Sequence, residues 1–222
     1  MGVAGARGRG AGRCLVGGLA ALVLMAVAGC GSSAGPPVSG PAPGGGSPYQ
    51  ADVVRLPFAK PAGVFTDTNG TPFDLNKDTA GHPTLLYFGY THCPDVCPLT
   101  MASLGAAVNK LPTQQREAFR VVFITTDPHR DTPQRLQRWL AAFGKDFIGL
   151  TGSWRTISRA ARRLHVAAVK PRLTKSGDYR VTHGAQVFGF SPAGDRAYLF
   201  PAGTSARDFG HDLPLLAKGV RP

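Results

Sequence analysis

Two runs of mostly apolar residues, 84–90 and 120–126, limit the possible folds of this chain more than any other feature of its sequence. Neither run alternates polar with apolar residues, which is typical of strands buried on both faces of a sheet. A helical pattern lies between them and opens at Pro98, since proline suits the first position of a helix. Its apolar positions are Leu99, Met101, Leu104, Val108 and Leu111. This order of strand, helix and strand predicts two parallel strands at the centre of an α/β sheet.

Two hairpins are predicted outside this unit. Residues 64–66 and 72–75 flank Asn69-Gly70, a dipeptide that favours the positive backbone angles of a tight turn. Residues 186–190 and 197–200 are joined through a Pro-Ala-Gly-Asp segment and predict a closing hairpin. The sheet is therefore expected to be mixed, with antiparallel strands beside the central parallel pair.

Three further helices are indicated by capping residues and helical spacing. Thr132, followed by Pro133, is a typical N-cap, and apolar residues follow it at Leu136, Trp139, Leu140 and Phe143. Ser153 caps a second pattern, whose apolar face holds Trp154, Ile157, Ala161 and Leu164. A short C-terminal helix is expected from about Thr204. The order strand, helix, strand, helix, helix, hairpin, helix predicts an α/β, thioredoxin-like domain, with a central mixed sheet flanked by helices and an N-terminal β-hairpin.

The N-terminal residues resemble a targeting signal rather than part of the fold. Arg7, Arg9 and Arg13 precede an apolar run over residues 15–29, which is too short to span a bilayer comfortably. Residues 1–29 are therefore predicted to be a signal peptide of the lipoprotein type. The run ends Val-Ala-Gly before Cys30, as in a bacterial lipobox, so we expect Cys30 to be lipidated. The alternative is ordinary signal cleavage that leaves Cys30 free.

Residues 30–50 are predicted to be the lipidated cysteine and a tether, and residues 51–222 to be the folded domain. Six Gly, five Pro and four Ser lie between residues 31 and 48, a composition that cannot pack a core. The protein would then sit on the extracytoplasmic face of the cell membrane, held by its lipid. Export excludes nucleic acid as a partner, and no nucleic-acid-binding motif is present.

The charge balance is strongly basic. The formal net charge of +12 falls by three to +9 when the signal arginines are removed. The excess positive charge either lies on a solvated surface without a partner, or attracts the domain to the anionic membrane or to an acidic partner.

The folded domain keeps only two cysteines, Cys93 and Cys97, once the signal peptide has left and Cys30 carries lipid. They lie between a buried strand and a helix, at the carboxyl edge of the sheet where α/β folds place their sites. Each precedes a proline, which disfavours helical geometry, so we expect a rigid turn outside the helix itself. The adjoining helix N-terminus favours the thiolate form. Two such thiols either form a disulfide or bind metal.

The spacing of the pair favours a metal. Three residues separate the thiols, one more than in the common thiol–disulfide oxidoreductases. Two thiolates select Cu(I), zinc or iron–sulfur, but a structural zinc site needs four ligands and a cluster generally needs four cysteines. Cu(I) accepts two thiolates and one imidazole. Among His82, His92, His129, His165, His183 and His211, His183 is favoured because the loop entering the strand at 186–190 faces the cysteine turn in thioredoxin-like topology.

Four segments, 88–98, 124–133, 150–152 and 179–183, resemble the motifs of the Sco/SenC family and follow one another in the same order. The resemblance runs from about residue 63 to the C-terminus. It implies a thioredoxin fold with family insertions and one copper ion, Cu(I) or Cu(II), held by Cys93, Cys97 and His183. It also implies a copper chaperone for the copper centre of cytochrome c oxidase, with the oxidase subunit or another copper carrier as partner.

The chain departs from the family pattern beside the histidine and in the second motif. Thr182 stands where an acidic residue is usual, Gly184 where a hydroxylated one is usual, and His129 where glutamate is common. The segment 127–133 is expected to be a structured turn and helix cap, with partner contact as the alternative. The runner-up function is a thiol–disulfide oxidoreductase that reduces the cysteines of the oxidase copper site through the redox-active pair Cys93 and Cys97. Peroxidase activity is a third and weaker alternative.

Overall fold

The structure, a computed structural model, describes residues 47–170, 179 and 181–222. Cys30, the expected signal peptide and most of the expected tether lie outside these residues. Within the described ranges no helix has both the length and the apolar character needed to cross a membrane.

A six-stranded mixed sheet forms the centre of the domain, in the order β1-β8-β7-β4-β5-β6. Its strands are β1 (Val54–Leu56), β4 (Thr84–Gly89), β5 (Arg120–Thr125), β6 (Ile148–Leu150), β7 (Val187–Phe190) and β8 (Ala197–Phe200). The predicted parallel pair is confirmed, since β4 and β5 run side by side with Thr84 opposite Arg120 and Gly89 opposite Thr125. All six residues of β4 are buried. The closing hairpin is confirmed as β7 and β8, which pair antiparallel.

A separate two-stranded sheet is the predicted N-terminal hairpin, β2 (Val64–Thr66) and β3 (Pro72–Asp74). The carboxylate of Asp67 accepts hydrogen bonds from the backbone N–H groups of Asn69 and Thr71 at 2.9 and 2.8 Å. Gly70 has φ +80°, a backbone conformation that residues with a Cβ atom rarely adopt. The hairpin that the Asn-Gly dipeptide indicated is therefore present, with a positive φ at Gly70 but not at Asn69.

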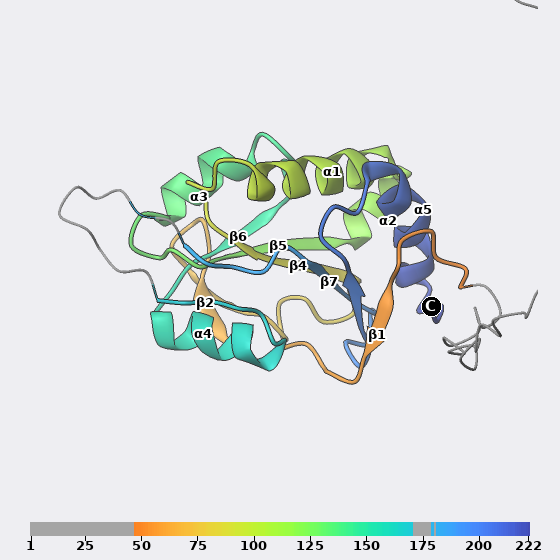
Figure 1. Ribbon diagram of the computed structural model, residues 1–222, viewed down its shortest axis with the longest axis horizontal. Helices are drawn as coiled ribbons and strands as arrows, with labels where there is room; N and C mark the ends of the chain where they lie inside the picture. The colour runs from red at the N-terminus through yellow and green to blue at the C-terminus, as the bar shows by residue number, and fades with distance from the viewer. Residues whose placement is uncertain (1–46, 171–178, 180) are drawn as a thin grey trace, which may run out of the picture. The chain divides into compact units, whose positions relative to one another are not determined.

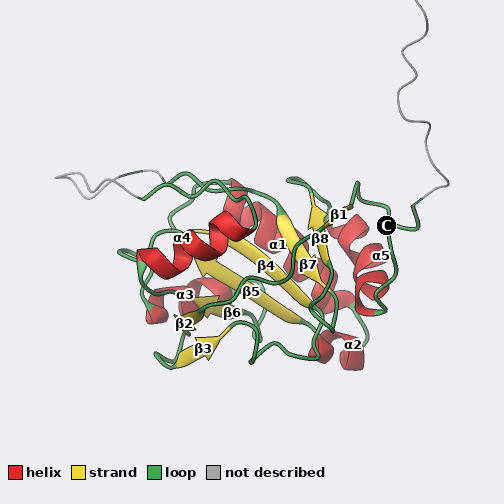
Figure 2. Ribbon diagram, turned by 90° about the horizontal axis from the view of Figure 1, so that it is seen from below, coloured by secondary structure: helices red, strands yellow, loops and turns green. Residues whose placement is uncertain are grey.

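Helices cover both faces of the central sheet (Figures 1 and 2), and the described ranges hold five. They are α1 (Val96–Lys110), α2 (Thr113–Ala118), α3 (Pro133–Leu140), α4 (Trp154–Arg163) and α5 (Ala206–Ala217). Buried side chains of α1, α3 and α5 share one hydrophobic core with one face of the sheet. Those of α4 share a second core with the other face. The sheet thus separates α4 from α1.

Two helix boundaries differ from the sequence prediction. Helix α1 begins at Val96 rather than Pro98, because the Asp95 side chain accepts the N–H of Val96 as an N-cap. Cys97 therefore lies inside the first helical turn, and the expectation that both cysteines precede the helix is wrong. Pro98 is tolerated there because N–H groups of the first turn have no intrahelical partner. Helix α3 ends at Leu140, so Phe143 follows it rather than belonging to it.

The other predicted caps are present. The hydroxyl oxygens of Thr132 and Ser153 accept backbone N–H groups of Arg135 and Thr156, each at 3.2 Å. Helix α5 is capped by Ser205, one residue after the expected start.

Candidate metal centre

The two cysteines lie where β4 gives way to α1. Cys93 belongs to the loop and Cys97 to the first turn of the helix. The Cys97 side chain is fully buried, and Cys93 is 9% exposed. The backbone N–H of Cys97 lies 3.5 Å from the Cys93 sulfur and points at it. The Cys93 sulfur therefore accepts a backbone hydrogen bond from the first turn of the helix.

His183 precedes β7 and reaches both sulfur atoms. Its Nε2 atom lies 3.3 Å from the Cys97 sulfur and 3.7 Å from the Cys93 sulfur. Its Nδ1 atom lies 2.9 Å from the carbonyl oxygen of Gly184. A carbonyl only accepts, so Nδ1 carries the hydrogen of the neutral ring, and the lone pair on Nε2 faces the sulfurs.

The three residues that the sequence singled out as ligands are thus brought together. Their ligand atoms all lie within 4.8 Å of one another, and in the described part of the chain no other group of three His, Cys, Asp or Glu residues converges in this way. The donor set, two thiols and one imidazole, suits a soft ion of low coordination number such as Cu(I). It supplies too few ligands for a closed zinc site.

Burial changes the acid–base behaviour of the site. Desolvation raises the pKa of the Cys97 thiol well above its usual range. The expectation that the helix N-terminus favours thiolate is therefore wrong for Cys97. Desolvation also raises the pKa of Tyr87, whose hydroxyl lies 3.6 Å from the Cys97 sulfur. A metal ion that binds Cys97 must displace a firmly held proton.

Aromatic and glycine residues around the ligands were not recognised in the sequence as parts of the site. The rings of Tyr87 and Tyr90 meet the His183 ring edge-on, with centroids 6.3 and 5.4 Å away. At Gly89, a Cβ atom would lie 2.8 Å from the Cys97 sulfur, so only glycine leaves room for that thiol. In the sequence Tyr87 belonged to the apolar pattern of a buried strand, and Gly89 and Tyr90 to the segment 88–98, but neither pattern indicated their contacts with the thiol or the imidazole.

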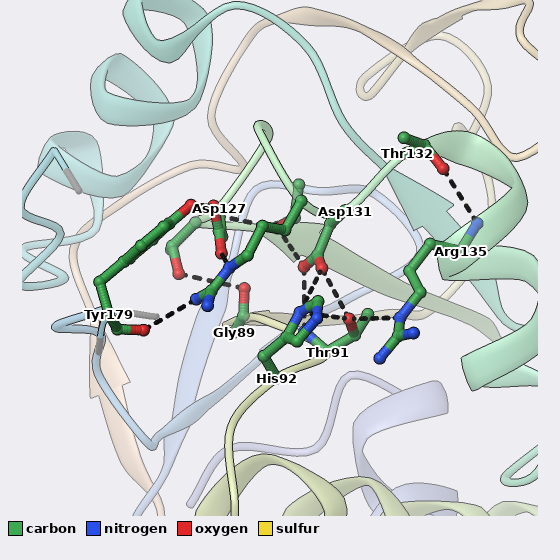
Figure 3. Close-up of polar contacts among 11 residues, drawn as sticks. Gly89, Thr91, His92, Asp127, Asp131, Thr132, Arg135 and Tyr179 are labelled. Atoms are coloured by element: carbon green, nitrogen blue, oxygen red, sulfur yellow. Dashed lines mark hydrogen bonds and ion pairs between the residues drawn. The ribbon is translucent and has the colours of Figure 1, made fainter. Parts of the chain in front are cut away.

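A buried carboxylate ties the cysteine turn to the segment after β5. Asp131 is fully buried and accepts hydrogen bonds from the N–H and hydroxyl of Thr91 at 2.9 and 2.6 Å. It also accepts one from the Thr125 hydroxyl at 2.6 Å. Figure 3 shows the Asp131 carboxylate directed at Thr91 and His92. Because Thr91 lies two residues before Cys93, these bonds fix the turn that carries the first sulfur.

A second buried carboxylate, Asp127, holds the start of the histidine loop. It pairs with Arg130 Nε at 2.5 Å and accepts the hydroxyl of Tyr179 at 2.7 Å, as Figure 3 shows for Asp127 and Tyr179. We call these three residues the Asp127–Arg130–Tyr179 clasp. Desolvation and the bond to Asp127 raise the pKa of Tyr179 to about 12. The segment 127–133 is therefore a structured turn and cap, as expected, and it also supports the loop that leads to His183.

The remaining predicted residues lie apart from the cluster. The five other histidines of the domain contribute no ligand atom to it. Of these, His82 contacts the Ala118 carbonyl, His211 contacts Asp212, and His129 is exposed on the turn. Cys30 lies outside the described residues, so its lipidation stays a prediction.

The sequence is similar to a known protein family and to individual proteins. A protein-family model described as SCO1/SenC matches residues 59–217. A putative copper-binding protein of Stutzerimonas stutzeri is 37% identical over 147 residues, which cover 65% of this chain and 71% of that protein. The mitochondrial SCO1 homolog 1 of Arabidopsis thaliana is 37% identical over 160 residues, 68% of this chain and 46% of that protein. The chain thus spans less than half the length of this mitochondrial relative.

Solved structures show the same architecture. ScoI of Bradyrhizobium japonicum with copper bound matches with a TM-score of 0.63 and 31% identity, over 70% of this chain and 98% of that one. Yeast Sco1 matches with a TM-score of 0.67 and 27% identity, over 72% of this chain and 98% of that one. The thioredoxin-like fold expected from the sequence is confirmed by these matches together with the mixed sheet.

Proposed function

The chain belongs to the SCO1/SenC family, and from that premise we propose that it is a copper chaperone that binds one copper ion through Cys93, Cys97 and His183. The observation that carries the proposal is the convergence of two sulfurs and the free lone pair of His183 Nε2 within 4.8 Å. Copper-binding relatives at 31% and 37% identity support copper as the ion.

The geometry suits an ion that must both enter and leave. Cu(I) enters the reduced pair, and each thiol loses its proton as the copper–sulfur bond forms. At Cys97 this proton is held by burial, so metal binding is coupled to proton release. Oxidation of the pair to a disulfide removes both thiolates and closes the site to copper. Three protein ligands leave Cu(I) open to a fourth donor from an acceptor protein.

We extend the proposal to the location of the protein and to the protein that receives the copper. A signal peptide over residues 1–29, a lipid on Cys30 and a tether up to residue 50 would hold the domain at the extracytoplasmic face of the membrane. The acceptor would be the copper-bearing subunit of cytochrome c oxidase or another copper carrier. This part rests on the lipobox pattern and on the family motifs in the sequence.

A second function, thiol–disulfide exchange with the acceptor's cysteines, is favoured by one observation. Only Cys93 is partly reachable, at 9% exposure, whereas Cys97 is fully buried, and the Cys97 N–H points at the Cys93 sulfur. This asymmetry is what a redox pair needs, with Cys93 as the attacking thiolate and Cys97 as the resolving thiol.

Anaerobic titration with Cu(I) tests the leading proposal. The reduced protein should take up about one equivalent in competition with a Cu(I) chelator. The Cys93→Ser and Cys97→Ser variants should lose high-affinity uptake. His129→Ala is the matched control, because that histidine is exposed on the turn and outside the cluster. Uptake that survives both cysteine substitutions would contradict the site.

A further inference from the structure

The outer side of helix α4 carries only basic charge. Ile157, Ala160 and Ala161 face the core. Exposed arginines occupy the other side, at Arg155, Arg159, Arg162 and Arg163. Their spacing of four, three and one places them on one side of the helix. We call these four residues the arginine face. In Figure 2, α4 lies across the near face of the sheet.

No carboxylate balances these charges in the described residues. The stretch from Ser153 to Lys170 contains no Asp or Glu, and no ion pair of the described residues involves an arginine of this face. The exposed side chains of His165 and Lys170 follow the helix. The surface is therefore basic without internal compensation.

Helix stability does not account for this pattern. Arg162 and Arg163 in the last turn complement the helix dipole, but Arg155 lies in the first turn, where positive charge is unfavourable. Arg155 and Arg159, and Arg159 and Arg163, are also four residues apart, a spacing at which like charges repel. At Arg155 both effects destabilise an isolated α4, and an anionic partner would remove the repulsion.

Three of the arginines line one hollow beside the helix. It has a volume of about 350 Å³ and is lined by Pro61, Ala62, Arg159, Arg162 and Arg163. A guanidinium presents paired N–H donors that match two oxygens of a phosphate group. Three such groups around an otherwise apolar wall suit a phosphate ester that also carries carbon.

We propose that the arginine face binds the phosphate groups of anionic phospholipids and lays the α4 side of the domain on the membrane. The proposal rests on the lipid anchor of the proposed function. A tether over residues 30–50 spans at most roughly 70 Å, so the anchor would keep the domain within reach of a dense layer of headgroup phosphates. That proximity favours lipid over an acidic protein as the partner.

The arrangement would leave the metal centre accessible. Helix α1, which carries Cys97, lies on the opposite face of the sheet from α4 (Figure 1). With the arginine face on the lipid, α1 and the cysteine turn are on the side away from it. An acceptor protein can then approach the sulfurs while the domain stays docked.

The domain without its anchor is the material for the test, because the anchor would bind any vesicle. Both hydrophobic cores lie within residues 47–222, and the solved ScoI chain is matched over 98% of its length by 70% of this chain. A domain of this extent therefore folds by itself. Its binding to vesicles of phosphatidylglycerol and phosphatidylcholine is compared with binding to pure phosphatidylcholine, by co-sedimentation at low and high salt.

The main variant replaces all four arginines with glutamine, which keeps helix propensity. Since each arginine near an anionic surface contributes roughly five-fold, binding to phosphatidylglycerol vesicles should fall by roughly 100-fold or more. The matched control removes four exposed charges elsewhere, with Lys77→Gln, Lys110→Gln, Arg207→Gln and Arg221→Gln, and should lose less than about ten-fold. A third variant with four Arg→Lys changes keeps the charge and should bind better than the glutamine variant. Circular dichroism checks that all three are folded.

Each result bears on the proposal. Binding that needs phosphatidylglycerol, is screened by salt and is lost only with the arginine face supports it. Equal losses in the matched control would show an effect of net charge and overturn it. Binding of inorganic phosphate to the arginine face, without binding of the domain to vesicles, would assign a small anion instead of lipid. Cu(I) uptake of the glutamine variant should stay near one equivalent, so failure of the lipid proposal and failure of the copper proposal give different results.

Discussion

The guanidinium of Arg130 lies 3.7 Å from the ring centroid of Tyr179 and donates a hydrogen bond of 3.0 Å to the Tyr179 carbonyl oxygen. The two residues are 49 positions apart, and Tyr179 lies four residues before His183. Because Asp127 holds the other side of the guanidinium, the start of the histidine loop is fixed to the turn after β5. The position of His183, the third proposed metal ligand, therefore depends on residues that touch neither sulfur.

Arg130→Lys should weaken copper binding without abolishing it. Lysine keeps the charge opposite Asp127 but loses the planar stacking on Tyr179 and the fork that bonds the carbonyl. These contacts are worth about 1–2 kcal/mol together, so Cu(I) affinity should fall by about ten-fold and copper release should be faster. Chelator competition and stopped-flow release measure both.

Tyr179→Phe is the matched variant for this prediction, because it keeps the stacked ring and loses only the hydroxyl bond to Asp127. Its affinity should lie between those of the wild type and Arg130→Lys. Unchanged affinity and release rate in Arg130→Lys would show that the clasp does not position His183.

Asp131→Asn should destabilise the fold. An amide in place of this fully buried carboxylate turns one acceptor oxygen into a donor that faces Thr91 and Thr125, which are themselves donors. Leaving buried donors without an acceptor costs about 1–3 kcal/mol, measurable by denaturant unfolding. Asp195→Asn, at a partly exposed ion pair with Arg196, should cost less than about 1 kcal/mol. Equal losses in the two variants would contradict a structural role for Asp131.

The central strands and the cysteine pair were predictable because their signals are local. The buried runs of β4 and β5 and the capping residues Thr132 and Ser153 each occupy a few consecutive positions. The edge strands β1 and β6 were missed, since each has three residues and no periodicity can appear over that length. Helix α2 was also missed. It has six residues and no buried side chain, so it shows no apolar periodicity in the sequence.

The start of α1 and the clasp were missed for two other reasons. At Cys97, the rule that a residue before proline avoids the helix was outweighed by the Asp95 cap. The contact of Arg130 with Tyr179 is tertiary and joins segments that have no common sequence pattern. For His183, sequence spacing alone left six histidines open, and the topology of the sheet selected one.

The contribution of Lys60 to the stability of the domain should rise between pH 8 and pH 10. Its ammonium group is buried beside Thr79 and Thr84, and burial lowers its pKa from 10.5 to about 8. Below pH 8 the folded state carries the full cost of a buried charge. Between these two pKa values the unfolded state binds more protons at Lys60, so the contribution of this residue to stability increases with pH.

Lys60→Met isolates this effect. The hydroxyls of Thr79 and Thr84 keep their bonds to the Leu75 and His82 carbonyls, so no donor is left unpaired. The free energy of unfolding of the wild type, minus that of the variant, should increase by about 1–3 kcal/mol from pH 7 to pH 10. For the exposed Lys77→Met control, the free energy of unfolding should change with pH as it does for the wild type. The same pH dependence in Lys60→Met would refute the prediction.

Cys30→Ser should release the protein from the membrane. If the cysteine is diacylated, metabolic labelling with a fatty acid marks the wild type and not the variant, and a diacyl anchor holds far more firmly than a single chain. Fractionation and labelling of cells that express either form measure this. A wild-type protein that is unlabelled and found in the soluble fraction would exclude the lipoprotein assignment.

His183→Ala should separate copper delivery from thiol–disulfide exchange. Exchange depends on the thiolate fraction, the leaving thiol and access to sulfur, none of which requires the imidazole, so reduction of a model disulfide should largely persist. Copper binding loses one of three ligands. Cu(I) binding should weaken, and Cu(II) binding should be lost because that ion prefers more donors, imidazole among them. Cu(I) competition, Cu(II) titration and an exchange assay on one preparation test the three expectations, with His129→Ala as the control.

In cells, a strain that carries only His183→Ala should lose oxidase activity if copper delivery is the function. Added copper should restore part of it, because the two sulfurs still bind Cu(I) weakly and mass action compensates for lower affinity. A reductase would behave differently, since its thiols are intact and its activity would not depend on the copper supply. Full oxidase activity in this strain at limiting copper would therefore argue against His183 as a functional ligand and favour the reductase.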